Sequence, residues 1–399
     1  MTDIPQKFDF DRIIDRRDTD SIKWCMYGPD VLPMWVADMD FLSPPAVIDA
    51  LRARVERGVF GYPRENQELS EVIVERLRRL YGWEIQTDWV IHLPGVITGF
   101  NLACQAFARP GEGILIQTPV YTPILHAPET GGFSCNETQL VQDAGGRYEV
   151  DFDAFEAAIT GQTRVFLLCN PHNPVGRDFH REELEKMAEI CLRRGVILVS
   201  DEIHSDLLFS ETRHVPIASL SPEVAARSVT LMSASKTYNI AGLQSAFAVI
   251  PDQTLRKEFI KARRGLIHWV NLMATTAVLA AYRESQDWLD ELLVYLEGNR
   301  DFLVHAIRER FPRISMRAPE ATYLAWLDCR RLPLNESAFF FFLREARVAL
   351  VDGAGFGKGG EGFARLNFGC PRSVLKEALD RMEEALFRLE QKTGELPRG

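Results

Sequence analysis

The sequence lacks the features that mark membrane-spanning, secreted and nucleic-acid-binding proteins. It has no apolar run of about eighteen residues, which a membrane-spanning helix would need, and Met1–Lys7 lack the apolar core of a signal peptide. The net charge of −10 argues against nucleic acid as a partner, because surfaces that bind it carry an excess of lysine and arginine. The seven cysteines include no C-x-x-C pair, which predicts reduced thiols in a cytoplasmic protein.

The sequence also has no internal repeat and no low-complexity segment, so its fold is read from hydrophobic periodicity. Helical periodicity covers 46–58, 65–81 and 181–194. From about residue 90 to 250, short apolar runs alternate with such helical segments. This alternation predicts an α/β fold with a mostly parallel sheet covered by helices.

The C-terminal part of the chain has a different pattern, which predicts a second, smaller unit. It opens with a long helical segment at 286–310 and continues with a short strand at 322–327. Helical periodicity returns at 336–347 and at 372–391. A chain of 399 residues is long enough for two domains.

Three apolar runs in the predicted sheet are each followed by polar side chains. The runs are Val165–Cys169, Val196–Ser200 and Val229–Met232, and they read as strands buried on both faces. Ligands of open α/β sheets bind beyond the carboxyl ends of the strands. The sequence therefore predicts one cleft that collects the residues following these runs, namely Asn173, Asp201, His204, Ser233, Ser235 and Lys236.

This combination of side chains suits the cofactor pyridoxal 5′-phosphate (PLP). A lysine holds the aldehyde of PLP as a Schiff base, and a carboxylate keeps its ring nitrogen protonated. Lys236 is predicted to fill the first role and Asp201 the second. Once released by substrate, Lys236 is also the predicted base that removes the Cα proton.

The remaining polar side chains of the cleft are predicted to contact other parts of the cofactor. Ser233 and Ser235 can donate hydroxyl hydrogen bonds to its phosphate. Asn173 and His204 can hydrogen-bond its phenolic oxygen. No metal is predicted, because the histidines lack regular metal-site spacing.

These residues resemble those of fold type I PLP enzymes, the aspartate aminotransferase superfamily. Asn173-Pro174, Asp201-Glu-Ile-His204 and Ser233-Ala-Ser-Lys236 fall in the order of that family and at roughly its separations. The resemblance implies that the backbone of Gly95, Val96 and Ile97 holds the phosphate at a helix N-terminus. It also implies that the ring of Tyr121 stacks on PLP and that Tyr62 reaches the cofactor of the other subunit in a homodimer. The substrate is then expected to be bound by Arg365, Asn173, Tyr121 and Ala37.

A narrower resemblance lies near the N-terminus, in Lys23-Trp24 and Leu32–Phe41. These residues are similar to the PatB/MalY branch, the cystathionine β-lyase-like C–S lyases. The resemblance implies β-elimination from L-cystathionine or another L-cysteine S-conjugate. Our own hypothesis is that Tyr121 lies near the departing sulfur. It further implies a small domain built from 1–45 and 286–399 around a large domain of 46–285.

Two other functions remain open at this point. An aminotransferase of the same fold would use the same Lys236, Asp201 and Arg365, and would differ in the fate of the proton removed from Cα. A PLP-binding regulatory protein would act by protein contact, as one member of the branch does. The sequence departs from many relatives at Gln244, where they carry a basic residue near the phosphate, and at His204, where aminotransferases commonly carry tyrosine.

Overall fold

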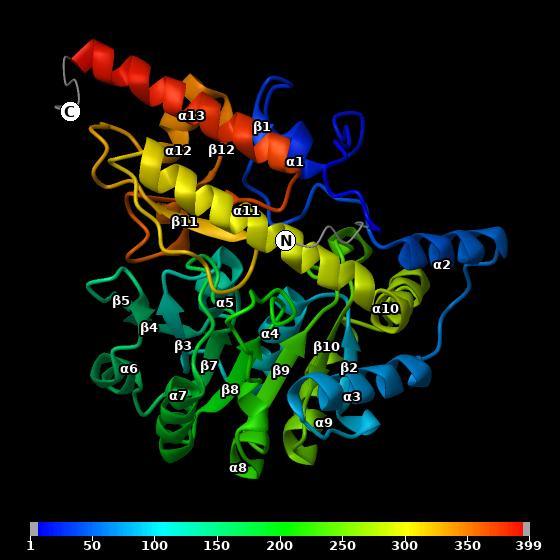
Figure 1. The fold of residues 1–399 in the computed structure, drawn as a ribbon. Helices are drawn as coiled ribbons and strands as arrows, with labels where there is room; N and C mark the ends of the chain where they lie inside the picture. Colours follow the sequence, from blue (N-terminus) through cyan, green and yellow to red (C-terminus); the bar gives the residue numbers. More distant parts are fainter. Residues whose placement is uncertain (1–6, 394–399) are drawn as a thin grey trace.

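A computed structural model of the chain describes residues 7–393. The prediction made for Met1–Lys7 lies outside these residues except at Lys7. The predicted small domain, 1–45 with 286–399, extends beyond them at both ends. A seven-stranded sheet occupies the centre of one half of the molecule (Figure 1). In spatial order its strands are β2 (Val90–Leu93), β10 (Ala246–Val249), β9 (Ser228–Met232), β8 (Ile197–Asp201), β7 (Thr163–Cys169), β3 (Gly113–Thr118) and β4 (Ser134–Gln139).

The sheet is mostly parallel, as the sequence predicts. Only β10 runs against its neighbours β2 and β9, and the other paired strands are parallel. Successive residues of β7 and β8 enter separate cores on the two faces of the sheet. Leu167 and Val199 pack with Phe100 of α4 (Val96–Phe107), whereas Phe166 and Leu198 pack with Met187 of α7 (Arg181–Arg194). Burial on both faces explains why these strands read as continuous apolar runs.

Helices cover both faces of the sheet and extend around its edge. The predicted segment 65–81 forms α3, which begins after the cap residue Asn66 and ends at Gly82 in the left-handed region. The other helices of this half are α2 (Pro45–Glu56), α4 (Val96–Phe107), α5 (Thr122–Thr130), α6 (Phe152–Ala158), α7 (Arg181–Arg194), α8 (Pro222–Ala225), α9 (Gln253–Arg263) and α10 (Leu272–Glu284), with α3 at Gln67–Tyr81.

The second half joins the beginning of the chain to its end. Strand β1 (Leu32–Pro33) pairs in parallel with β12 (Val348–Ala349), so the blue and orange-red segments lie together in Figure 1. Around them stand α1 (Ile22–Cys25), α11 (Gln286–Arg310), α13 (Arg372–Thr393) and the antiparallel strands β11 (Leu324–Asp328), β14 (Phe363–Asn367) and β13 (Val351–Asp352). The domain boundaries at 45 and 285 stay a prediction.

The predicted helix at 336–347 is less regular than its periodicity indicates. It consists of α12 (Ala338–Phe341) and a π-helical turn, Phe342–Ala346, and it stops at Arg347 with φ 55°. Phe341 and Phe342, the two residues at the junction of α12 and this turn, are both buried. Among the described residues, no helix has the length and apolarity needed to cross a membrane.

Candidate active site

The largest concentration of predicted site residues lines one cavity of about 440 Å³ at the carboxyl ends of β7, β8 and β9. This position matches the rule for ligands of open α/β sheets. Seventeen residues line the cavity, and ten of them belong to the predicted set. These ten are Ala37, Gly95, Val96, Ile97, Tyr121, Asn173, Asp201, His204, Ser235 and Lys236.

Lys236 and Asp201 carry the opposite charges of this cavity. Lys236 Nζ donates a hydrogen bond to the carbonyl oxygen of Ala37 at 2.7 Å. Removal from water lowers the pKa of Lys236 to about 8, although Asp38 acts against this shift. Removal from water also raises the pKa of Asp201 to about 7, although the backbone N–H of Ile203 donates to its carboxylate at 3.1 Å. Both pKa values therefore lie close to neutral pH, where each group can gain or lose a proton.

Arg365 lies on β14 and reaches the cavity wall through Asn173. Its Nη1 donates to Asn173 Oδ1 at 2.8 Å, and its Nη2 donates to the carbonyl oxygen of Trp35 at 3.0 Å. The guanidinium also lies over the ring of Phe356, 5.1 Å from its centroid. Burial lowers the pKa of Arg365 to about 10. Arg365 is thus a buried cation whose partners are neutral amide oxygens rather than a carboxylate.

His204 and Tyr121 are neutral groups at neutral pH. Burial, followed by the charges of Lys236 and Arg365, lowers the pKa of His204 to about 3. The buried Nδ1 atom of His204 has no hydrogen-bond partner among the described residues. Burial raises the pKa of Tyr121, and the charge of Asp201 acts in the same direction. Each ring can therefore exchange hydrogen bonds with a ligand without changing its charge.

The far end of the cavity is formed by the first turn of α4 and by the turn after β9. Gly95 caps α4, so the backbone amides that open this helix face the cavity without intrahelical partners. Ser233 does not line the cavity. Its hydroxyl oxygen lies 2.6 Å from the Ser245 carbonyl oxygen and 2.8 Å from Ser235 Oγ, so Ser233 fixes the turn on which Ser235 stands. Gln244 lines the same end in a left-handed conformation, with φ 57°.

Tyr62 does not lie at this cavity within one chain. Its side chain is 91% exposed, and its ring lies against that of Trp269, with ring centroids 5.5 Å apart. Trp269 is itself half-exposed. The predicted contact of Tyr62 with the cofactor of another subunit is therefore not reached by the single chain.

Sequence reasoning missed the residues that hold the cavity wall around Ala37. Tyr323 and Asn367 come from β11 and β14 regions about 290 and 330 positions away, and both donate to carbonyl oxygens of this wall. The wall is also tied down by Lys23, which is 1% exposed and donates to Asp40 at 2.7 Å. Lys23 belongs to the motif that resembles the C–S lyases, and Asn367 stands two residues after Arg365 in another family motif, so both were visible signals for the network.

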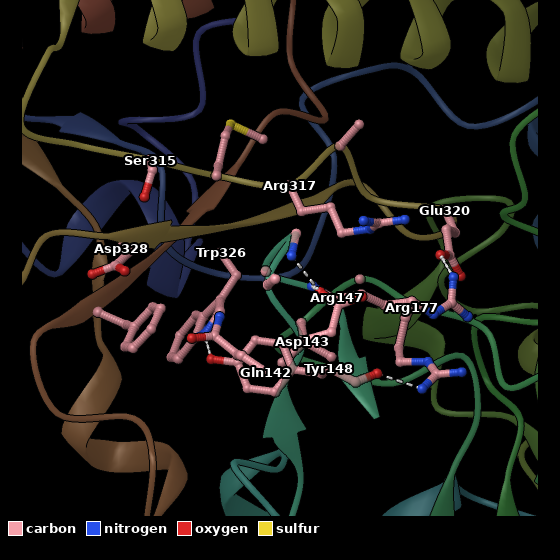
Figure 2. Close-up of a pocket in the computed structure, with 18 of the residues that line it drawn as sticks. Gln142, Asp143, Arg147, Tyr148, Arg177, Ser315, Arg317, Glu320, Trp326 and Asp328 are labelled. Atoms are coloured by element: carbon pink, nitrogen blue, oxygen red, sulfur yellow. Dashed lines mark hydrogen bonds and ion pairs between the residues drawn. The ribbon is translucent and has the colours of Figure 1, made fainter. Parts of the chain in front are cut away.

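A second cavity of about 350 Å³ lies between strand β6 (Tyr148–Glu149) and the segment that leads to β11 (Figure 2). Its polar groups are mostly paired with one another. Arg147 is paired with Glu320 at 2.5 Å, and Trp326 donates to the hydroxyl of Tyr148 at 3.0 Å. None of the predicted site residues lines this cavity. We assign it no catalytic role.

Comparison with known proteins places this geometry in a family. The family model described as aminotransferase class I and II matches residues 29–382. The chain belongs to the aminotransferase class I and II family. Within that family it is 40% identical to cystathionine beta-lyase PatB of Bacillus subtilis, over 94% of this chain and 99% of PatB. It is 33% identical to protein MalY of Escherichia coli, over 95% of this chain and 99% of MalY.

Solved structures of aminotransferase class I and II relatives have the same fold. Cystalysin from Treponema denticola superposes with a TM-score of 0.93 at 32% identity, and the match covers 96% of this chain and 100% of cystalysin. That structure is described as containing a pyridoxal 5′-phosphate cofactor. The fold type I assignment and the resemblance to the PatB/MalY branch are therefore confirmed.

Proposed function

We propose that this protein is a PLP-dependent C–S β-lyase. It converts L-cystathionine or another L-cysteine S-conjugate, together with water, into a thiol, pyruvate and ammonia. The 40% identity to cystathionine beta-lyase PatB supports this reaction. The observation that carries the proposal is the cavity lined by both Lys236 and Asp201, with Arg365 hydrogen-bonded to Asn173 of its wall.

The donor set of the cavity fits PLP. The carboxylate of Asp201 is buried with only one backbone donor, so it requires a cation such as a protonated ring nitrogen. The free Nδ1 of His204 and the side chain of Asn173 can hydrogen-bond a phenolic oxygen. When bound, PLP supplies an electron sink that stabilises the negative charge left on a substrate after loss of its Cα proton.

The phosphate of PLP would lie at the start of α4. The backbone amides of Val96 and Ile97 and the hydroxyl of Ser235 would donate to it, and the helix dipole favours its negative charge. Apart from Lys236, no lysine or arginine of the described chain lines this cavity. Gln244 stands where many relatives place a cation, so these neutral donors and a residue of a second subunit would carry the binding.

The substrate would be held by its carboxylate and deprotonated by Lys236. Arg365 can donate two parallel hydrogen bonds to the carboxylate, while Asn173 and the backbone of Ala37 complete its binding site. The lowered pKa of Lys236 gives it a neutral amine fraction at neutral pH, which a general base requires. The electron pair left on the substrate then expels the β-thiolate.

The reaction is tested by adding L-cystathionine to the purified protein without any keto acid. A C–S lyase releases pyruvate continuously under these conditions. An aminotransferase would instead consume one equivalent of amino acid and stop, because no keto acid regenerates it. Absence of turnover with every amino acid tried would favour a PLP-binding regulatory protein.

The hydroxyl of Tyr121 is proposed to lie near the departing sulfur and to donate a proton to it. Tyr121→Phe keeps the ring that would stack on PLP but removes this donor. We expect kcat/KM for cystathionine cleavage to fall about tenfold, the effect of one lost hydrogen bond in a transition state. An unchanged kcat/KM would show that only the ring of Tyr121 matters.

The active protein is proposed to be a cytoplasmic homodimer in which Tyr62 completes the cofactor site of the other subunit. Exposed apolar side chains near Tyr62 support this proposal, since a monomer would leave them in water; they are Val59, Phe60, Leu266 and Trp269. Light scattering should give twice the chain mass of 45.3 kDa. Secretion of the protein in cell fractionation would contradict the location.

A mixed dimer separates a contribution across the interface from one within the chain. Tyr62→Ala and Lys236→Ala homodimers should both be impaired. A co-expressed mixed dimer should regain activity, because one of its two sites combines Lys236 of one chain with Tyr62 of the other. Absence of recovery in purified mixed dimers would exclude this role of Tyr62.

A further inference from the structure

The carbonyl oxygens of four successive residues at the cavity wall are all held by side chains from distant parts of the chain. We call residues 35–38 the wall segment. The donors to these carbonyls come from positions 23, 236, 323, 365 and 367, so the segment is fixed by tertiary contacts rather than by a helix or strand. In chain order the accepting residues are Trp35, Val36, Ala37 and Asp38.

The carbonyl of Ala37 has two donors, and one of them is the proposed catalytic lysine. Lys236 Nζ donates to the Ala37 oxygen at 2.7 Å, and the hydroxyl of Tyr323 donates to the same oxygen at 2.9 Å. The contact with Lys236 requires a free amine or ammonium. The Ala37 carbonyl is therefore within reach as an acceptor whenever the amine of Lys236 is not bound to the cofactor.

Tyr323 is held rigidly in this position. Its side chain is fully buried, and its ring packs edge-on against that of His204 at 6.2 Å. The residue before it, Thr322, is buried with φ 70°, a conformation that is rare for a β-branched residue and costs stability. Strain of this kind is concentrated at functional sites. Here it lies directly before the residue whose hydroxyl reaches the wall segment.

We propose that Tyr323 is a positioning residue for Lys236, acting through the carbonyl of Ala37; this inference rests on the proposed PLP chemistry. When Lys236 takes the Cα proton, the C–H electron pair stays on the substrate and the neutral amine becomes an ammonium. The new ammonium must place an N–H on an acceptor, and the Ala37 oxygen lies 2.7 Å from Lys236 Nζ. The Tyr323 hydroxyl keeps that oxygen in place, so the lysine stays aligned with the Cα–H bond.

Tyr323→Phe removes the hydroxyl and keeps the ring. The test measures exchange of the Cα proton of L-alanine with D2O by NMR, using PLP-loaded protein. We expect the exchange rate to fall about tenfold, as for loss of one well-placed hydrogen bond. The dissociation constants of PLP and L-alanine should change by less than about twofold, because Tyr323 does not line the cavity.

Tyr148→Phe is the matched control. The Tyr148 hydroxyl is also buried and hydrogen-bonded, but its partner is Trp326 at the second cavity (Figure 2). This variant should lose comparable thermal stability and keep the exchange rate of the unaltered protein. An equal loss of exchange in both variants, or a normal rate in Tyr323→Phe, would overturn the proposal.

A second readout uses the protein without PLP. Hydrogen–deuterium exchange of the backbone amides in 36–40 should accelerate in Tyr323→Phe, because the wall segment has lost a tether, and should be unchanged in Tyr148→Phe. Unaltered exchange in both variants would contradict the proposed tether. L-alanine has no β leaving group, so its Cα exchange also occurs in an aminotransferase. Normal alanine exchange without pyruvate from cystathionine would therefore refute the lyase assignment alone.

Discussion

Lys236→Ala is expected to abolish the visible absorption of lysine-bound PLP and to lower turnover by several orders of magnitude. The substitution removes both the covalent attachment point of the cofactor and the base that takes the Cα proton. No other described lysine lines the cavity, so no side chain of the same kind can take over these tasks. Absorption spectra after addition of PLP, followed by a pyruvate assay with L-cystathionine, would measure the two losses.

The matched control is Lys257→Ala, which removes an exposed lysine on α9 outside the cavity. It should bind PLP and turn over substrate as the unaltered protein does. Comparable thermal unfolding of the two variants would show that the loss in Lys236→Ala is chemical. If Lys236→Ala retained either the absorption band or the turnover, the assignment of Lys236 would be wrong.

The residues at the carboxyl ends of the sheet strands could be predicted from the sequence, because each of them follows a local apolar run. Asn173 follows β7, Asp201 ends β8 and Lys236 follows β9, and these three strands are parallel neighbours. An apolar run that ends in a polar residue is visible in one dimension. Parallel pairing then brings the ends together without any further information from the sequence.

The walls could not be predicted in this way, because they depend on contacts between distant segments. Arg365 hydrogen-bonds Asn173 across 192 positions, and only resemblance to a family pointed to it. Nothing in a local pattern indicates that Tyr323 reaches Ala37. Ser233 lies outside the cavity lining and its hydroxyl hydrogen-bonds the Ser245 carbonyl, so its contact with the cofactor stays a prediction.

A common physical cause shifts the ionisable groups of the site. Removal from water is the largest influence on Lys236, Asp201, His204 and Arg365, and in each case it favours the uncharged form. An unpaired charge in this cavity therefore raises the free energy of the folded protein. A ligand with a cationic ring nitrogen and an anionic carboxylate would supply the missing partners of Asp201 and Arg365.

Asp201→Asn should separate the effect of the buried carboxylate on stability from its role in catalysis. In the protein without PLP, burial raises the pKa of Asp201 from 3.8 to about 7. The folded state therefore favours the protonated acid, and ionisation destabilises it on the order of 4 kcal/mol once the pH exceeds 7. Asparagine removes the charge, so the PLP-free variant should be more stable than the unaltered protein at pH 8. The difference should shrink as the pH falls from 7 towards 4, where both states of the unaltered protein become protonated.

The same substitution should nearly abolish catalysis, because an amide cannot keep the ring nitrogen of PLP protonated. Turnover of L-cystathionine should fall by at least about a hundredfold, while PLP still attaches to Lys236. Denaturant unfolding between pH 4 and 8 and pyruvate release at pH 8 measure the two effects, with Asp18→Asn, an exposed carboxylate, as control. A PLP-free variant that is less stable at pH 8 would contradict the raised pKa. A variant with normal turnover would remove Asp201 from the catalytic set. Greater stability combined with lost activity would show that the folded protein keeps a destabilising buried carboxylate because the cofactor needs its charge.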